Sequence, residues 1–150
     1  MTTVGTMPLS DGTARHASLI GSEDRLARLV AVAMLTVTAA VHVPLAVQHI
    51  SEVPYLGVSM YAFVLVAAGL VGLLATSSNT MLWRVVLVLS VVAIATYVVS
   101  RTVGLPLASD DIGHWFSTSA LLALAAQAIL VAVSLSVLRH RHASAARALR

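Results

Sequence analysis

Six side chains that can bind metal ions or transfer protons are predicted to lie near one end of a set of apolar segments. They are His42, His49, Glu52, Asp110, Asp111 and His114. Histidine nitrogens and carboxylate oxygens together suit zinc, copper and iron. We therefore interpret five of them as candidate ligands of a transition metal or of a haem iron: His42, His49, Glu52, Asp111 and His114.

Spacing along the chain limits which candidates can share one ion. His42 and His49 lie on one stripe of a helix but about 10 Å apart along its axis. They cannot bind the same ion unless the helix unwinds after Pro44. A haem held by His42 and His114 fits less well, because the two residues differ in predicted depth. The feasible site is formed by His49, Glu52, Asp111 and His114.

The histidines of the first predicted helix also have ordinary structural interpretations. Pro44 frees the backbone carbonyl of Ala40, four residues earlier, and bends the helix axis. His42, two residues before the proline, can cap backbone groups freed in this way. His49 and Glu52 are placed by the sequence in a short exposed turn between two helices.

The acidic residues of the other turn have similar alternatives. Asp110 or Asp111 can cap the N-terminus of the last helix, and His114 is spaced for a local contact with them. Arg101 carries a positive charge at an end where arginine is otherwise absent, so we expect an acid to compensate it. We predict an ion pair of Arg101 with Glu52, or with one of Asp110 and Asp111. Glycine and proline after Arg101 indicate a tight turn.

The elements that position these residues are four apolar segments. Of the 150 residues, 59% are hydrophobic and only 10% are charged, more apolar surface than a soluble domain of this size can bury. About 20 apolar residues in a helix span the hydrocarbon core. The sequence predicts an all-α, integral membrane, up-down four-helix bundle. Its spans are 26–47, 55–76, 81–100 and 115–138.

Arginine distribution predicts the orientation. Eight of the nine arginines lie on one side of the spans, and only Arg101 lies on the other. Basic residues flanking spans mark the cytoplasmic side, so we expect both termini in the cytoplasm of a bacterial cell and the protein in its plasma membrane. Residues 1–24 are expected to form a flexible tail and residues 139–150 a basic tail. The basic residues are expected to contact lipid, and no nucleic-acid partner is predicted.

Several residues inside the spans predict how the helices pack. Small residues let helix backbones approach in lipid, and they recur as Gly69 and Gly72 and as Ala128, Ala132 and Ser136. Gln127 is predicted to form a hydrogen bond between helices or between copies of the chain. Four aromatic residues are expected to mark the membrane interfaces: Trp83 on the inner side, and Tyr55, Tyr97 and Trp115 on the outer side.

Two stretches resemble small four-span membrane proteins of actinobacteria. They are AAVHVPLAVQHISEVPYLG and TYVVSRTVGLPLASDDIGHW, and the resemblance covers most of residues 30–138. It implies the same fold and the same outer histidines, acids and Arg101 turn, but it implies no activity. The start of the last helix departs from that group, because it reads FSTSALLA where the group is rich in Glu and Pro.

Three functions follow as hypotheses. The first is a non-catalytic accessory or assembly subunit, which associates with other membrane subunits or with itself. The second is a metal- or haem-binding membrane protein, redox-linked or a sensor, that uses the outer histidines and acids. The third is a small multidrug-type transporter, which the sequence disfavours because the first span carries no deep carboxylate. The absence of cysteine excludes thiolate metal sites and disulfide chemistry.

Overall fold

The computed structural model describes residues 11–77 and 79–149, and in that part it contains four α-helices and one short 3₁₀ helix. Each α-helix is long and apolar enough to cross a membrane. The prediction of an all-α bundle with four membrane-spanning helices is therefore confirmed. The helices are α1 (Asp11–Glu52), α2 (Pro54–Thr76), α3 (Thr80–Thr102) and α4 (Thr118–Ala148), with η1 (Ser109–Asp111) before α4.

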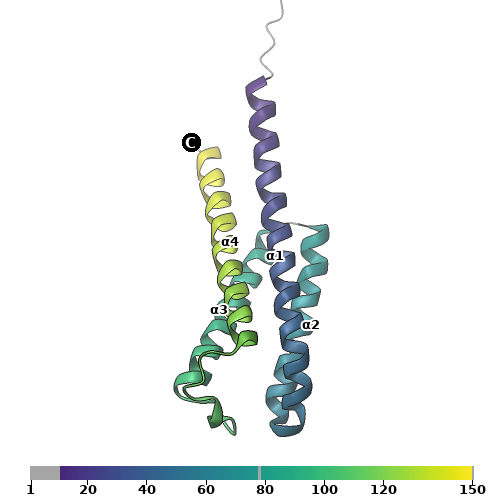
Figure 1. Cartoon of the computed structure of the whole chain (residues 1–150). Helices are drawn as coiled ribbons and strands as arrows, with labels where there is room; N and C mark the ends of the chain where they lie inside the picture. Colours follow the sequence, from purple (N-terminus) through teal and green to yellow (C-terminus); the bar gives the residue numbers. More distant parts are fainter. Residues whose placement is uncertain (1–10, 78, 150) are drawn as a thin grey trace, which may run out of the picture.

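Two helical hairpins make up the bundle (Figure 1). α1 packs along α2, α3 packs against α4, and the contact between α1 and α4 joins the two hairpins. Although α2 and α3 are joined by a short connection, they contact each other little, and α3 leans away from α2 towards the lower end of the bundle (Figure 1). Neighbours in the chain are therefore not always neighbours in the packing.

The hydrophobic core lies in the half of the bundle that is next to the free ends of α1 and α4. Each of the four helices contributes to it, and Trp83 is its largest fully buried side chain. We call this the arginine-rich end, because it carries Arg25, Arg28, Arg84, Arg139, Arg141 and Arg147. The buried core residues are Ala31, Leu35, Ala67, Leu70, Leu74, Trp83, Val86, Leu130, Val137 and Leu138.

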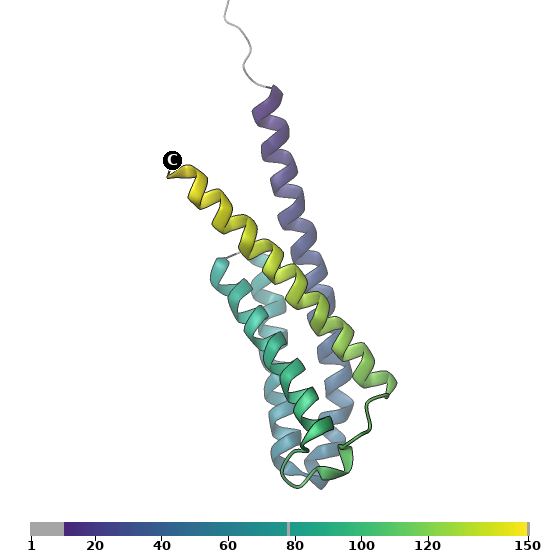
Figure 2. The same ribbon diagram turned by 90° about the vertical axis from the view of Figure 1, so that its left-hand side faces the viewer.

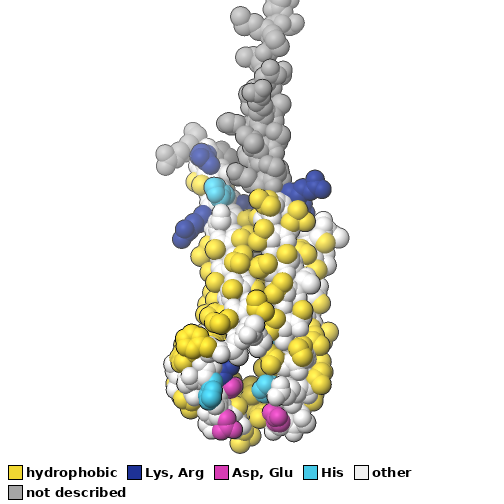
Figure 3. All heavy atoms as spheres, viewed as in Figure 1, with side chains coloured by type: hydrophobic (Ala, Val, Ile, Leu, Met, Phe, Trp, Pro, Cys, Tyr) yellow, Lys and Arg dark blue, Asp and Glu magenta, His cyan; other side chains and the backbone are white. Residues whose placement is uncertain are grey.

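At the opposite end the two hairpins separate. We call this end the rim; it consists of the α1–α2 junction, the last turns of α3 and the loop of residues 103–117. Figure 3 shows a notch between the α1–α2 junction and the loop, with histidine and acidic side chains on both of its sides. The charge separation expected from the sequence is therefore present in the fold.

The helix ends are set by local signals. Val53 alone separates α1 from α2, and Pro54 is at the start of α2, where a missing N–H costs nothing. The Asn79 side chain accepts a hydrogen bond from the Met81 N–H (2.9 Å) and caps α3. Ser117 caps α4 by accepting from the Ala120 N–H (3.3 Å).

Both terminal helices extend beyond the predicted spans. α1 begins at Asp11, inside the segment 1–24 that we expected to be a tail, and α4 continues to Ala148, through most of the segment 139–150. The rest of the two predicted tails, residues 1–10 and Arg150, lies outside the described residues. Polar and basic residues thus prolong the apolar spans as helix.

Packing corrects two expectations about side-chain direction. Trp83 does not mark the membrane interface, because it is fully buried in the core. The small residues Gly69, Gly72, Ala128, Ala132 and Ser136 are all exposed, and neither glycine lies at a close approach between the described helices. Close approach instead occurs at Gly57, where an added Cβ atom would lie 2.6 Å from the Cα atom of Ile50 on α1.

Gln127 of α4 is buried and bonds between helices, one of the two arrangements predicted for it. Its Nε2 donates to the Thr38 hydroxyl of α1 at 3.5 Å. Its Oε1 is buried with no hydrogen-bond partner. This polar contact lies within the α1–α4 interface that joins the two hairpins.

Candidate functional site

Arg101 forms the most extensively bonded element of the rim. Its Nη1 lies 2.5 Å from Oδ1 of Asp111 and also donates to the Asp111 backbone carbonyl at 3.1 Å. The Gly113 N–H donates to the Arg101 carbonyl at 3.0 Å. These three contacts fasten the loop before α4 onto the last turn of α3.

Asp111 is therefore the acid that compensates Arg101. Among the residues that the structure describes, no ion pair joins Arg101 to Glu52 or Asp110, the other acids considered for this role. Asp111 reaches the arginine because η1 places it next to the end of α3. The expected compensation is present, and it lies within one hairpin rather than between the two.

Aromatic side chains complete the surroundings of Arg101. Its guanidinium carbon lies 5.3 Å from the centre of the Tyr97 ring, within the range of a cation–π interaction. The Tyr97 hydroxyl donates to the Trp115 carbonyl at 2.6 Å, and the two rings meet edge to face. The Arg101 guanidinium thus lies against a ring and a carboxylate, while its Nε is buried without a hydrogen-bond partner.

The loop itself has a defined backbone. Gly104 adopts a left-handed conformation (φ 83°), and its N–H donates back to the Val99 carbonyl at the end of α3. The Tyr55 hydroxyl, from the start of α2, donates to the Pro106 carbonyl at 2.5 Å and connects the two hairpins across the rim. The turn predicted from Gly104 and Pro106 is therefore present, and it is joined to α2.

We had expected His49 and Glu52 to lie in a loop, but they lie in the last turn of α1. Helical bonding continues to the end of α1, because the Val53 N–H donates to the His49 carbonyl at 2.8 Å. The ring Nδ1 of half-buried His49 lies 2.8 Å from the Leu45 carbonyl. Glu52 is exposed. The rigid helix end, rather than a flexible turn, sets the direction of both side chains.

His42 lies in the same helix, two turns farther from the rim than His49. Its Nδ1 is 2.8 Å from the Thr38 carbonyl, and its ring centre is 4.8 Å from that of Phe63 on α2. The carbonyl it bonds is therefore not that of Ala40, which Pro44 frees. Because α1 continues through Pro44 to Glu52, His42 and His49 remain two helical turns apart and cannot share one ion.

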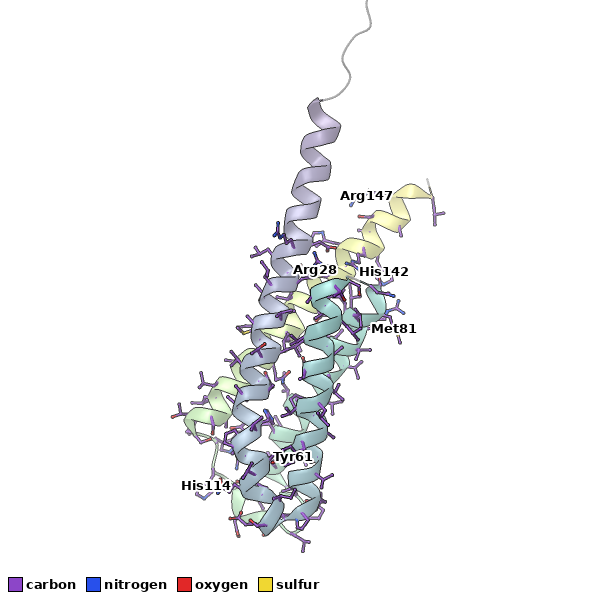
Figure 4. All side chains as sticks on the ribbon, turned by 90° about the vertical axis from the view of Figure 1, so that its right-hand side faces the viewer. Arg28, Tyr61, Met81, His114, His142 and Arg147 are labelled. Carbon is purple, nitrogen blue, oxygen red and sulfur yellow. The ribbon has the colours of Figure 1, made fainter. Side chains whose placement is uncertain are left out.

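Asp110 and His114 are both exposed. The His114 N–H donates to the Asp111 carbonyl at 3.2 Å, a turn of the backbone rather than a side-chain contact. Figure 4 shows the His114 side chain pointing away from the bundle. Neither Asp110 nor Asp111 caps α4, because five or more residues separate them from its first turn and Ser117 takes that position.

The rim thus brings together Arg101 and Asp111, and it leaves the other candidates apart. Within residues 24–77 and 79–149, no three histidine, aspartate or glutamate side chains are grouped so that they could hold a metal ion. The chemistry available at the rim is that of separate imidazoles and carboxylates on the two sides of a notch. Metal binding by His42, His49, Glu52, Asp111 and His114 stays a prediction.

Sequence reasoning missed the two tyrosines that bond the loop and an ion pair at the other end of the bundle. Tyr55 and Tyr97 were expected only to mark an interface, yet each hydroxyl donates to a loop carbonyl. The signal for this role was available, because a tyrosine placed near a polar loop has a hydroxyl that needs a partner. The ion pair of Arg141 with Asp24 had no such signal, because these residues are far apart in the chain.

Comparison with known proteins gives no further identification: no family model, no curated protein and no solved structure matches the chain.

Proposed function

We propose that the chain is a small, non-catalytic integral membrane protein that serves as an accessory or assembly subunit of a larger membrane complex. The observation that carries this proposal is a glycine-bearing face of α2 that has no neighbour among the residues that the structure describes. At Gly69 and Gly72, nothing lies within 4 Å of the position that a Cβ atom would take, apart from the helix's own backbone. Both residues are exposed.

Gly57 on the same helix provides the comparison. There the missing side chain lets α2 lie directly against Ile50 of α1. A glycine inside a helix costs about 0.5–1 kcal/mol relative to alanine, so its use is explained where it permits such an approach. Gly69 and Gly72 carry the same cost without a close approach to any other described part of the chain, which supports a helix of another subunit, or of a second copy, as their neighbour.

The surroundings of the two glycines support the same proposal. The residues of α2 that pack on α1 in this half, Ala67, Leu70 and Leu74, are buried, whereas Leu65 and Leu73 are 72% and 51% exposed. α3 does not cover this face, because it contacts α2 little. An apolar surface with two glycines in its middle is therefore left uncovered by the other described helices, as a lateral contact with another membrane helix requires.

Purification of the tagged full chain from its native membranes in a mild detergent tests the proposal. Gly69→Leu with Gly72→Leu fills the glycine face, and Ala95→Leu on the exposed side of α3 is the matched control. We expect the double variant to lose its co-purifying membrane subunits, or its self-association, and the control to keep them. A folded double variant that keeps its full set of partners would contradict the proposal.

A second candidate function, binding of a metal ion or haem, is favoured by the state of two histidines. In both His42 and His49 the Nδ1 lies 2.8 Å from a backbone carbonyl four residues earlier. A carbonyl only accepts, so Nδ1 donates and the ring is fixed; in a neutral imidazole held in this way, Nε2 is the nitrogen with the lone pair. Metal-binding histidines are commonly held in this way.

Metal analysis and absorption spectra of the purified chain test this second candidate. His49→Ala with His114→Ala should remove the bound metal, while His140→Ala with His142→Ala at the other end should not. Equal metal content in both double variants would count against the rim as a metal site.

The orientation is a proposal of its own. We propose that the arginine-rich end lies in the cytoplasm and the rim outside, in the plasma membrane of a bacterium. The concentration of arginine at the end formed by the outer parts of α1 and α4 supports this (Figure 3).

A further inference from the structure

A groove lies at the arginine-rich end, between α1 and α4 and beside the start of α3. Its volume is about 840 Å³, within the range of about 300–1,000 Å³ that small-molecule sites occupy. Beyond the groove, the ribbons of α1 and α4 diverge (Figure 2). The residues that line it are Asp24, Leu26, Ala27, Val30, Thr80, Ala132, Val133, Ser136, Val137, His140, Arg141 and Ser144.

The lining changes from apolar to polar along the helix axes. Its deeper part is formed by aliphatic side chains such as Val30 and Val133, and its outer part by His140, Arg141 and Ser144. The small side chain of Ala132, which is exposed, leaves room between the helices. This gradient matches a ligand that has a long apolar part and a polar head and that enters the groove from the bilayer.

Charge at the outer part selects the kind of head. The Arg141 guanidinium is held in place by Asp24 at 2.9 Å and by the Thr80 hydroxyl at 3.3 Å, so it faces the groove from a fixed position. Asp24 balances this one charge, and the other arginines of this end add positive charge. Figure 4 shows Arg28, His142 and Arg147 at this same end of the molecule.

We propose that this groove binds an anionic phospholipid, with an acyl chain between α1 and α4 and its phosphate headgroup beside Arg141 and His140. A basic pocket between spanning helices at the level of the headgroups suits such lipids. Arginine matches phosphate oxygens in geometry as well as in charge. The groove is at the opposite end of the bundle from the rim, and it does not depend on the glycine face of α2.

Native mass spectrometry of the full chain in detergent tests this proposal, with equal amounts of phosphatidylglycerol and phosphatidylcholine added. The two lipids carry similar acyl chains and differ in net headgroup charge. We expect the chain to retain phosphatidylglycerol at least about fivefold better, the preference that one basic residue near a membrane surface provides. Equal retention of the two lipids, or retention of neither, would overturn the proposal.

Two pairs of variants localise the site. Ala132→Phe fills the groove, whereas Ala128→Phe changes an exposed alanine one turn away that does not line it. Arg141→Gln removes the guanidinium from the groove, whereas Arg147→Gln removes a charge from the same helix outside it. We expect only the first member of each pair to lose the preference for phosphatidylglycerol. Loss in both members, or in neither, would show that the lipid binds elsewhere.

Discussion

Gly57→Ala tests the closest contact between the two helices of the first hairpin. The added Cβ atom would lie 2.6 Å from Cα, 2.7 Å from N and 2.8 Å from Cβ of Ile50. Carbon atoms pack at about 3.5–4.0 Å, so α1 and α2 must separate by roughly 1 Å to admit the methyl group. Because the atoms in the way are mainly backbone, no side-chain rotation relieves the contact.

The expected loss of stability is about 1–3 kcal/mol, as for other overpacked cores. Gly69→Ala is the matched control, because it makes the same chemical change on the same helix where nothing lies within 4 Å. That variant should gain about 0.5–1 kcal/mol, since alanine restricts the unfolded chain more than glycine does. The two variants should therefore differ by at least about 1.5 kcal/mol in opposite directions.

Reversible unfolding in mixed detergent and SDS micelles, followed by circular dichroism, measures both free energies of unfolding. The chain should be isolated from partners, so that Gly69 reports on the bundle alone. A Gly57→Ala variant as stable as the Gly69→Ala variant would refute the close approach of α1 and α2 at the rim.

Three further variants can be compared in the same assay. Asp111→Asn should lower the free energy of unfolding by at least about 1 kcal/mol, because it leaves the Arg101 guanidinium without its charge partner. Asp110→Asn, at an exposed position, should have no effect, and equal effects of the two variants would contradict the ion pair. Tyr55→Phe should lower the free energy of unfolding by about 0.5–1.5 kcal/mol and speed hydrogen exchange in the loop of residues 103–113, because it removes the hydrogen bond to Pro106. Tyr61→Phe should do neither. Unchanged exchange in the loop of the Tyr55→Phe variant would contradict the bond between the hairpins. Gln127→Leu should change stability by less than about 1 kcal/mol, because it removes a long hydrogen bond together with a buried acceptor that has no partner; a larger loss would show that the amide has a further role.

The four spans and the concentration of arginine at one end of the bundle were predictable, because both depend only on which residues occur in each short stretch of the chain. Hydropathy over about 20 residues identifies a membrane helix without knowledge of its neighbours. The turn after α3 was predictable for a similar reason, since Gly104 supplies a backbone conformation that other residues rarely adopt. An ion pair of Arg101 could be predicted because only a few acids lie at its end of the bundle and could balance its charge.

Side-chain direction was not predictable in the same way. Trp83 lies near the start of a span, a position that suits a membrane interface. It is a core residue only because the four helices converge there. The choice among acids for Arg101, and of Ser117 as the cap of α4, depends on the path of the loop, which a short 3₁₀ helix sets. The separation of α2 from α3 is equally a result of long-range packing.

We propose a bundle of four spans with its arginine-rich end in the cytoplasm and its rim outside. Because the chain has no cysteine, a single cysteine can be introduced at either end and labelled with a membrane-impermeant maleimide. Asp110→Cys at the rim should be labelled in cells with an intact plasma membrane, and His142→Cys only after the membrane is permeabilised. Labelling of His142→Cys in intact cells, with Asp110→Cys protected, would contradict the orientation.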